Sequence, residues 1–120
     1  MSELGLQPFM VPAVAEVELV AEKLRALVQR AQPRDLFDLH LYLVVSGWHL
    51  RAEELRQAVD AKLAITRHKR WKAGLWRSNL SDIESSWQTT MSAWVDPSRL
   101  PPCEEVVTEV DRALHALRLD

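Results

Sequence analysis

Two acids stand three residues apart in the segment RDLFDLHLYLVVS (34–46), which is otherwise rich in apolar residues. On a helix this spacing puts the carboxylates of Asp35 and Asp38 on one side. A buried acid must be paired, bound to a metal or kept neutral. In one interpretation Asp35 caps its helix and Asp38 forms a salt bridge with Arg34, Lys23 or Arg25. In the other, Asp38 is a site residue that faces Lys23 across a helical hairpin.

Lys23 lies at the boundary of the apolar face of the preceding helix, where a solvated side chain is the ordinary outcome. Its neighbours are unusual, because Arg25, Arg30 and Arg34 gather with the two acids around one helix junction. Such clusters occur at functional sites and in structural ion-pair networks alike. The spacing alone leaves both interpretations open.

A second charged segment, TRHKRWKAGLWR (66–77), combines cations with aromatic rings, and no acid occurs between Asp60 and Asp82. Cations interleaved with aromatic residues suit phosphate contact together with base stacking. In the alternative interpretation, the segment is a solvated loop whose tryptophans anchor it to the core. The candidate nucleic-acid contacts are Arg67, Lys69, Arg70, Trp71, Lys72 and Arg77.

Other familiar catalytic arrangements do not occur in the sequence. The histidines at positions 40, 49, 68 and 115 lack the spacing of a zinc helix, so we expect no metal site. No serine stands in a G-x-S-x-G turn, and no glycine-rich loop precedes a helix. Cys103 follows two prolines at a helix start, where buried packing is favoured over a reactive thiol.

Helical periodicity runs through most of the chain and predicts an all-α bundle of about five helices, packed around the second. Residues 1–12 form a loose or extended lead-in, with at most one short strand near residues 7–14, and residues 13–120 form a single helical domain. Gln32-Pro33, Gly47 and Pro101-Pro102 separate the helices. The sequence from Ser81 to Glu84 has the spacing of a capping box. The expected helices span about residues 17–28, 34–46, 51–66, 81–95 and 103–117.

Composition indicates an ordinary soluble globular protein, with 48% hydrophobic and 27% charged residues in a chain of 120. The formal net charge of −2 gives no case for a polyanion-coating protein, so any nucleic-acid contact must be local. No apolar run approaches the roughly 20 residues that cross a bilayer. A single cysteine and no signal peptide favour the cytoplasm.

Four segments together resemble the abortive-infection nucleotidyltransferase toxins of the AbiEii/AbiGii type. That family has an AEKL helix, then RDL-[YF]-DL, then an aliphatic helix, and this chain has both blocks in the same order and at the same separation. Two further segments are similar to later parts of the family, and the resemblance covers most of the chain from about Pro12. The four segments are AEKLRAL (21–27), RDLFDL (34–39), ELRQAVDAKLA (54–64) and PPCEEVV (101–107).

The resemblance implies membership of the DNA polymerase β-like nucleotidyltransferase superfamily, whose members transfer a nucleotide from an NTP with metal help. In the toxin branch this activity is linked to bacterial phage defence and type IV toxin–antitoxin pairs, with tRNA modification in some members. By motif, Lys23 resembles the lysine that contacts nucleotide phosphates, and Asp38, with Asp35 beside it, resembles the acid of the next motif. Arg30 and Arg34 would support the phosphate.

The chain departs from the family at the catalytic half. That chemistry needs a Gly-Ser turn followed by an Asp-x-Asp pair on a sheet, because two carboxylates hold the magnesium ions. Neither motif occurs here. The chain resembles the C-terminal helical half of the family, and we expect it to have no transferase activity alone. It needs no cofactor by itself, and Mg²⁺ and NTP are expected only with a complete catalytic domain.

Two classes of function remain. The chain is either the helical domain of a nucleotidyltransferase toxin or a stand-alone helical module that binds another protein and has no nucleotide chemistry. The expected partners are an N-terminal nucleotidyltransferase domain or an antitoxin, with RNA as a further candidate and no membrane. A surface apolar strip around the first helix or QPFMVPAV (7–14) would support self-association as a homo-oligomer.

Overall fold

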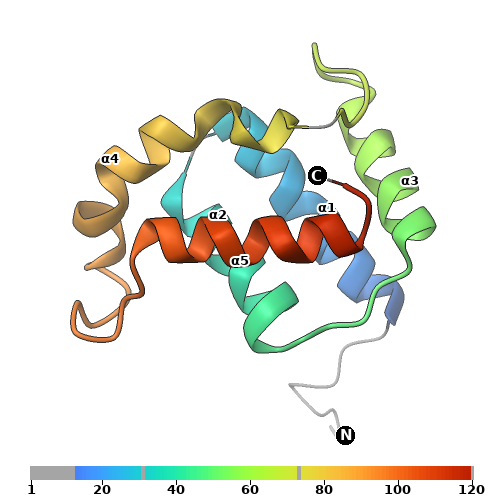
Figure 1. Cartoon of the computed structure of the whole chain (residues 1–120). Coiled ribbons are helices and arrows are strands. Elements are labelled where there is room, and N and C mark those ends of the chain that lie inside the picture. The colour runs from blue at the N-terminus through green and yellow to red at the C-terminus, as the bar shows by residue number, and fades with distance from the viewer. Residues whose placement is uncertain (1–12, 31, 73, 120) are drawn as a thin grey trace, which may run out of the picture.

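The computed structural model describes residues 13–30, 32–72 and 74–119, which form an all-helical domain (Figure 1). In this part of the chain there are five α-helices and two short helical turns of other types, and no strand. The predicted fold class is therefore confirmed. The elements are α1 (Ala13–Arg30), α2 (Pro33–His40), η1 (Leu41–Val45), α3 (Ala52–Leu63), η2 (Leu75–Asn79), α4 (Leu80–Met91) and α5 (Cys103–Ala116).

The core is built from one apolar stripe on each helix, as periodicity predicts. The α1 stripe is buried from Val20 to Val28, whereas Val17 is partly buried, and Leu36 and Leu39 from α2 belong to the same core. In α5, Val106, Val110 and Leu114 are buried at helical spacing. α1 packs against α2, α3 and η2, while α2 also packs against α4 and α5. The second helix is therefore central to part of the bundle, but α3 reaches the core chiefly through α1.

The second helix differs from its prediction as one continuous helix over residues 34–46. The α-helix ends at His40 and continues as a π-helical turn, η1, before Ser46 and the left-handed Gly47 (φ 65°). Gly47 thus supplies the predicted stop. The third helix ends at Leu63, three residues before the predicted boundary.

The predicted capping box at Ser81 is wrong. α4 begins at Leu80, directly after η2. The residue before it, Asn79, makes no side-chain hydrogen bond to the first backbone N–H groups of α4. Ser81 therefore lies inside the first turn. The apolar stripe is also shorter than predicted, because α4 ends at Met91 and leaves Trp94 beyond it with 62% of its surface exposed.

The N-terminal lead-in predicted for residues 1–12 lies outside the described residues. The strand considered near residues 7–14 is contradicted where it is described, because Ala13 and Val14 already belong to α1. Among the described residues, no helix has the length and apolar character that crossing a bilayer requires.

Candidate functional site

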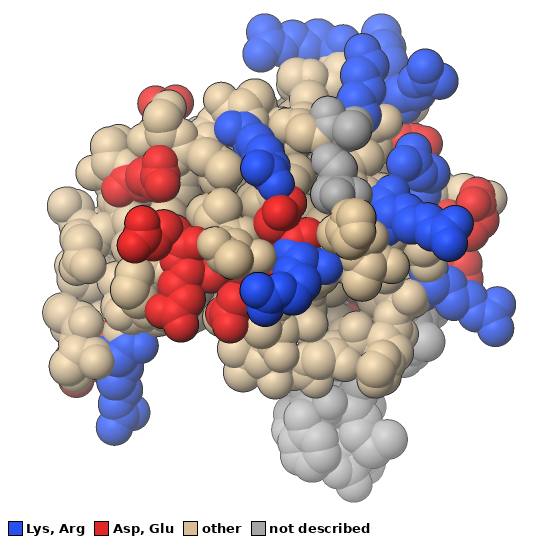
Figure 2. Space-filling view, viewed as in Figure 1, with Lys and Arg blue, Asp and Glu red and all other residues tan. Residues whose placement is uncertain are grey.

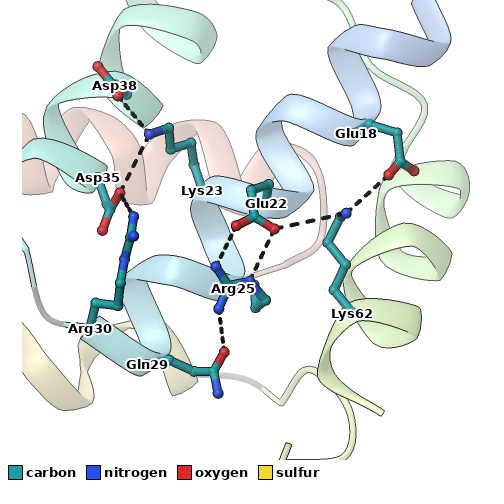
Figure 3. A network of polar contacts seen from close by, with 9 residues as sticks. All are labelled: Glu18, Glu22, Lys23, Arg25, Gln29, Arg30, Asp35, Asp38 and Lys62. Atoms are coloured by element: carbon teal, nitrogen blue, oxygen red, sulfur yellow. Dashed lines mark hydrogen bonds and ion pairs between the residues drawn. The ribbon is translucent and has the colours of Figure 1, made fainter. Parts of the chain in front are cut away.

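The candidate site lies at the junction between α1 and α2, where proline sets the turn. Arg30 ends α1, and Gln32 has an extended backbone (φ −97°, ψ 130°) immediately before Pro33. Proline fits the first helical turn because its missing N–H has no intrahelical partner there. The chain consequently starts α2 against α1, which brings Asp35 and Asp38 toward side chains from the second half of α1 (Figure 3).

Lys23 bridges the two acids. Its Nζ lies 2.8 Å from Oδ2 of Asp38 and 3.5 Å from Oδ1 of Asp35. Arg30 approaches from the end of α1, and its Nη2 donates to the same Oδ1 of Asp35 at 2.8 Å. The structure thus brings together four of the predicted site residues, Lys23, Arg30, Asp35 and Asp38, which we call the α1–α2 polar cluster (Figure 3).

The four side chains differ strongly in exposure. Asp35 is 2% exposed, Lys23 and Asp38 are about one fifth exposed, and Arg30 is half exposed. Oδ2 of Asp35 is buried and has no hydrogen-bond partner within the described ranges. An unpartnered buried carboxylate oxygen is unusual and costly, since buried polar atoms are nearly always hydrogen-bonded. Asp35 therefore does not act as the helix cap considered from the sequence, because both of its partners come from α1.

The electrostatics of Lys23 favour its charged form. Burial by itself lowers the pKa of Lys23, but the hydrogen bond to Asp38 and the charges of Asp38 and Asp35 outweigh it. The pKa of Lys23 is raised above its usual value of 10.5. The residue is therefore an ammonium throughout the physiological range, which is the form that attracts phosphate.

Two other predicted partners of the acids lie elsewhere. Arg25 pairs with Glu22 on its own helix, and Lys62 from α3 reaches Glu22 and Glu18 (Figure 3). The hydrogen bond from Arg25 is the main cause that lowers the pKa of Glu22. Arg34 does not join the cluster, because its guanidinium lies 4.1 Å from the ring centroid of Trp94.

The α1–α2 polar cluster suits a phosphate better than a metal ion. Lys23 and Arg30 supply donors for phosphate oxygens at an edge that solvent reaches. Asp35 and Asp38 each have one oxygen engaged by a cation. In the described part of the chain, no group of three or more His, Cys, Asp or Glu side chains is arranged to hold a metal. Magnesium would need oxygen ligands beyond these two carboxylates.

The tryptophans of the basic segment are buried. Trp71 is 2% exposed and Trp76 fully buried. The indole N–H of Trp71 donates to the carbonyl of Leu119 at 2.6 Å, and its backbone N–H donates to Oδ1 of Asp60 at 2.7 Å. This geometry contradicts base stacking on Trp71 and agrees with the alternative, in which the tryptophans anchor the segment to the core.

The cations of the basic segment stand outside this core. Arg67, Lys69, Arg70 and Lys72 are exposed, whereas Arg77 forms an ion pair with Asp111 of α5. Figure 2 shows Lys and Arg side chains gathered at the top and upper right of the molecule, over the stretch that joins α3 to η2 in Figure 1. Among the described residues, none of these cations forms an ion pair or hydrogen bond with the α1–α2 polar cluster.

Sequence reasoning missed several contacts because they join distant segments. His40 Nε2 lies 2.7 Å from Oε1 of Glu109, which links α2 to α5. Asn79 donates to the carbonyls of Leu27 and Val28 in the last turns of α1. No local spacing signals either contact. Cys103 is half-buried, and burial raises the pKa of its thiol to about 11, with Glu84 and Glu104 adding to the effect. The thiol is therefore unreactive at neutral pH.

Comparison with known proteins gives one finding that covers nearly the whole chain. The family described as "Nucleotidyl transferase AbiEii toxin, Type IV TA system" matches residues 1–115. No curated protein and no solved structure matches the chain. The match includes both segments that form the α1–α2 polar cluster. This chain belongs to the AbiEii nucleotidyl transferase toxin family of type IV toxin–antitoxin systems.

Proposed function

We propose that this chain is the helical part of a nucleotidyltransferase toxin and that the α1–α2 polar cluster forms one wall of its nucleotide site. The observation that carries the proposal is the position of Lys23, whose ammonium lies between Asp38 at 2.8 Å and Asp35 at 3.5 Å. These residues come from AEKLRAL (21–27) and RDLFDL (34–39), two of the four segments that resemble the family. Membership of a type IV toxin family also implies an antitoxin as partner.

Each residue has a distinct role in this proposal. Lys23 contacts the phosphates of the NTP, because a compact ammonium offsets the negative charge that develops there during transfer. Asp38 holds the ammonium in place and is solvated enough to release it to a ligand. Arg30, which is half exposed, supplies further donors, while Asp35 fixes Lys23 and Arg30 from within the core.

We further propose that the isolated chain transfers no nucleotide. Its sequence contains neither Gly-Ser nor Asp-x-Asp, and the described residues include no strand on which such a pair would stand. Two carboxylates that hold Mg²⁺ are central to this reaction class. A nucleotidyltransferase domain that provides these two carboxylates would complete the site. Magnesium and NTP would then bind at the interface between that domain and this chain.

The test is a titration of the purified chain with each NTP in the presence of magnesium, followed by calorimetry and by heteronuclear NMR. We expect binding at millimolar NTP that is lost in Lys23→Met, a change that keeps the apolar stem. Lys62→Met is the matched control, because Lys62 is a similarly buried lysine that also bridges two acids. Equal binding by the two variants, or no binding at millimolar NTP, would contradict the proposal.

A second candidate function is a helical module that binds another protein. The specific observation in its favour is that both cations of the cluster are already paired with acids, as in a purely structural network. Val45, Ile65 and Trp94 also expose large apolar surfaces. Light scattering tests self-association directly, since a homo-oligomer would have a mass that is a multiple of 13.8 kDa.

A further inference from the structure

The basic segment between α3 and α4 concentrates positive charge, whereas acidic residues outnumber basic ones in the rest of the molecule. Six of the fifteen Lys and Arg residues fall within residues 61–81, which contain none of the seventeen acidic residues. Arg67, Lys69, Arg70 and Lys72 are exposed and have no ion-pair partner within residues 13–30, 32–72 and 74–119. We call these four residues the basic loop. Its cations are therefore free to contact an external polyanion.

Hydrogen bonds at both ends fix the backbone of the basic loop. The buried Trp71 ties it to Leu119 through the indole and to Asp60 through the backbone. Thr66 closes the other end, because its hydroxyl donates to the carbonyl of Leu63 at 2.7 Å and accepts from the N–H of His68 at 3.1 Å. Lys69 has a left-handed backbone (φ 68°), which turns the chain sharply between these anchors. Less conformational entropy is lost when a preordered loop binds.

A hollow of about 480 Å³ opens beside the basic loop. Its surface mixes apolar carbon with hydrogen-bonding groups, and three of its side chains belong to the basic segment itself. The residues that line the hollow include Val28, Gln29, Arg67, His68, Leu75 and Ser78. This volume accommodates one nucleotide, which combines a flat apolar base, a polar base edge and a phosphate.

We propose that the basic loop and this hollow bind single-stranded nucleic acid. The phosphodiester backbone follows the four cations, and one nucleotide enters the hollow, where its base lies against the partly exposed Leu75 and its polar edge meets Gln29 and Ser78. Arg67 connects the two parts, because it belongs to the basic loop and also lines the hollow. This inference goes beyond the proposed function, since the binding needs neither NTP nor Lys23.

The hollow favours a polynucleotide over an acidic protein. Four exposed cations alone would attract any polyanion. A peptide of glutamates, however, has no flat apolar group to place against Leu75. A duplex keeps its bases stacked and would reach the cations only, so the hollow also favours a single strand. Because Trp71 and Trp76 are buried, specificity for the bases must come from the hollow and not from stacking on these rings.

Fluorescence anisotropy of the full chain with labelled ten-nucleotide oligomers tests the proposal. RNA and DNA strands of equal sequence are compared with the matching duplex and with a glutamate peptide of equal charge. We expect the single strands to bind at least about tenfold more tightly than the duplex and the peptide. Four phosphate contacts predict a plot of log K against log salt with a slope of about −3.

Two sets of variants locate the binding. Arg67→Gln, Arg70→Gln and Lys72→Gln together should weaken single-strand binding at least about tenfold and reduce the salt slope by about 2. Arg51→Gln, Arg99→Gln and Arg112→Gln remove the same charge from exposed positions elsewhere and should leave binding unchanged. Ser78→Phe fills the hollow and should abolish the preference for single strands, with circular dichroism confirming the fold.

Several outcomes separate this inference from the proposed function. Oligonucleotide binding by the basic loop is measured without magnesium or NTP, so failure of NTP binding leaves the prediction for the basic loop intact. Equal affinity for the RNA and DNA strands supports a site that contacts the phosphodiester backbone and the bases. Tighter binding of RNA would indicate additional contacts to the 2′-hydroxyl. Equal affinity for the glutamate peptide or the duplex, or equal loss in both triple variants, overturns the inference.

Discussion

Asp35 and Asp38 belong to one short motif, yet their surroundings give them different tasks. Asp35 is buried, and its bound oxygen faces two cations from α1. Asp38 is about one fifth exposed and pairs with Lys23 alone. Breaking a buried ion pair leaves charges that are poorly solvated, whereas partners near the surface regain water. Asp35 therefore stabilises the fold, whereas Asp38 can exchange its contact with Lys23 for water or a ligand.

Replacement of each acid should separate these tasks. We expect Asp35→Ala to lower the free energy of unfolding by about 1–3 kcal/mol, because a buried partner of Arg30 and Lys23 is lost. Asp38→Ala should cost less than about 1 kcal/mol and leave a helical protein that no longer binds nucleotide. Urea denaturation gives the unfolding energies, and calorimetry with NTP gives the binding.

The opposite ranking would contradict this division. If Asp38→Ala destabilised the domain as much as Asp35→Ala and no nucleotide binding existed to be lost, Asp38 would be a structural residue too. Asp38→Asn serves as a control of similar size, since it keeps a hydrogen-bond acceptor for Lys23 without the charge.

At the scale of elements, apolar spacing and proline predicted most of the fold. The stripes of α1 and α5 repeat every three to four residues and are buried as expected. Gln32-Pro33 separates α1 from α2, and this break is what lets Lys23 face Asp38. Both interpretations open at the sequence level allowed this approach, as a structural salt bridge or as part of a site, because the two residues belong to neighbouring helices.

What the sequence could not predict depends on packing between distant segments. The π-helical turn after His40 coincides with the contact of His40 to Glu109, which is 69 residues away. α4 follows directly from η2 and has no capping box at its start. Asn79, at this junction, donates a hydrogen bond to a carbonyl near the end of α1. In the sequence, Trp71 is an aromatic residue among cations. Its hydrogen-bond acceptor, the carbonyl of Leu119, lies near the end of the described chain. Local patterns carry no signal for such contacts.

The anchoring of the basic loop makes a prediction about Trp71. Trp71→Phe keeps an aromatic ring in the core but removes the N–H that donates to Leu119. The unpaired carbonyl and the smaller ring should lower the unfolding free energy by about 1–3 kcal/mol. Trp94→Phe is the matched control, because Trp94 is mostly exposed, and it should change stability by less than about 0.5 kcal/mol. Equal effects in thermal and urea unfolding would show that Trp71 is no anchor.

Over the whole molecule, local stability differs between helices because they pack against different numbers of neighbouring elements. α1 packs against α2, α3 and η2, and α2 continues the contacts to α4 and α5. α3 packs chiefly against α1, where Leu55, Val59 and Leu63 are buried and Lys62 pairs with Glu18 and Glu22. An element with one main neighbour can open while the remainder stays folded.

Native-state hydrogen exchange should reveal this hierarchy. We expect the amides of α3 to exchange with a lower opening free energy than those of α1 and α2, because opening α3 exposes one helix interface instead of several. Lys62→Met should lower the protection of α3 and leave α2 unchanged, since it removes the ion pairs that join α3 to α1. Arg112→Met, at an exposed position of α5, is the control and should alter neither helix. Identical opening energies for α1 and α3 at low denaturant would mean that the domain opens only as one cooperative unit, and the basic loop that follows α3 would then stay ordered until global unfolding.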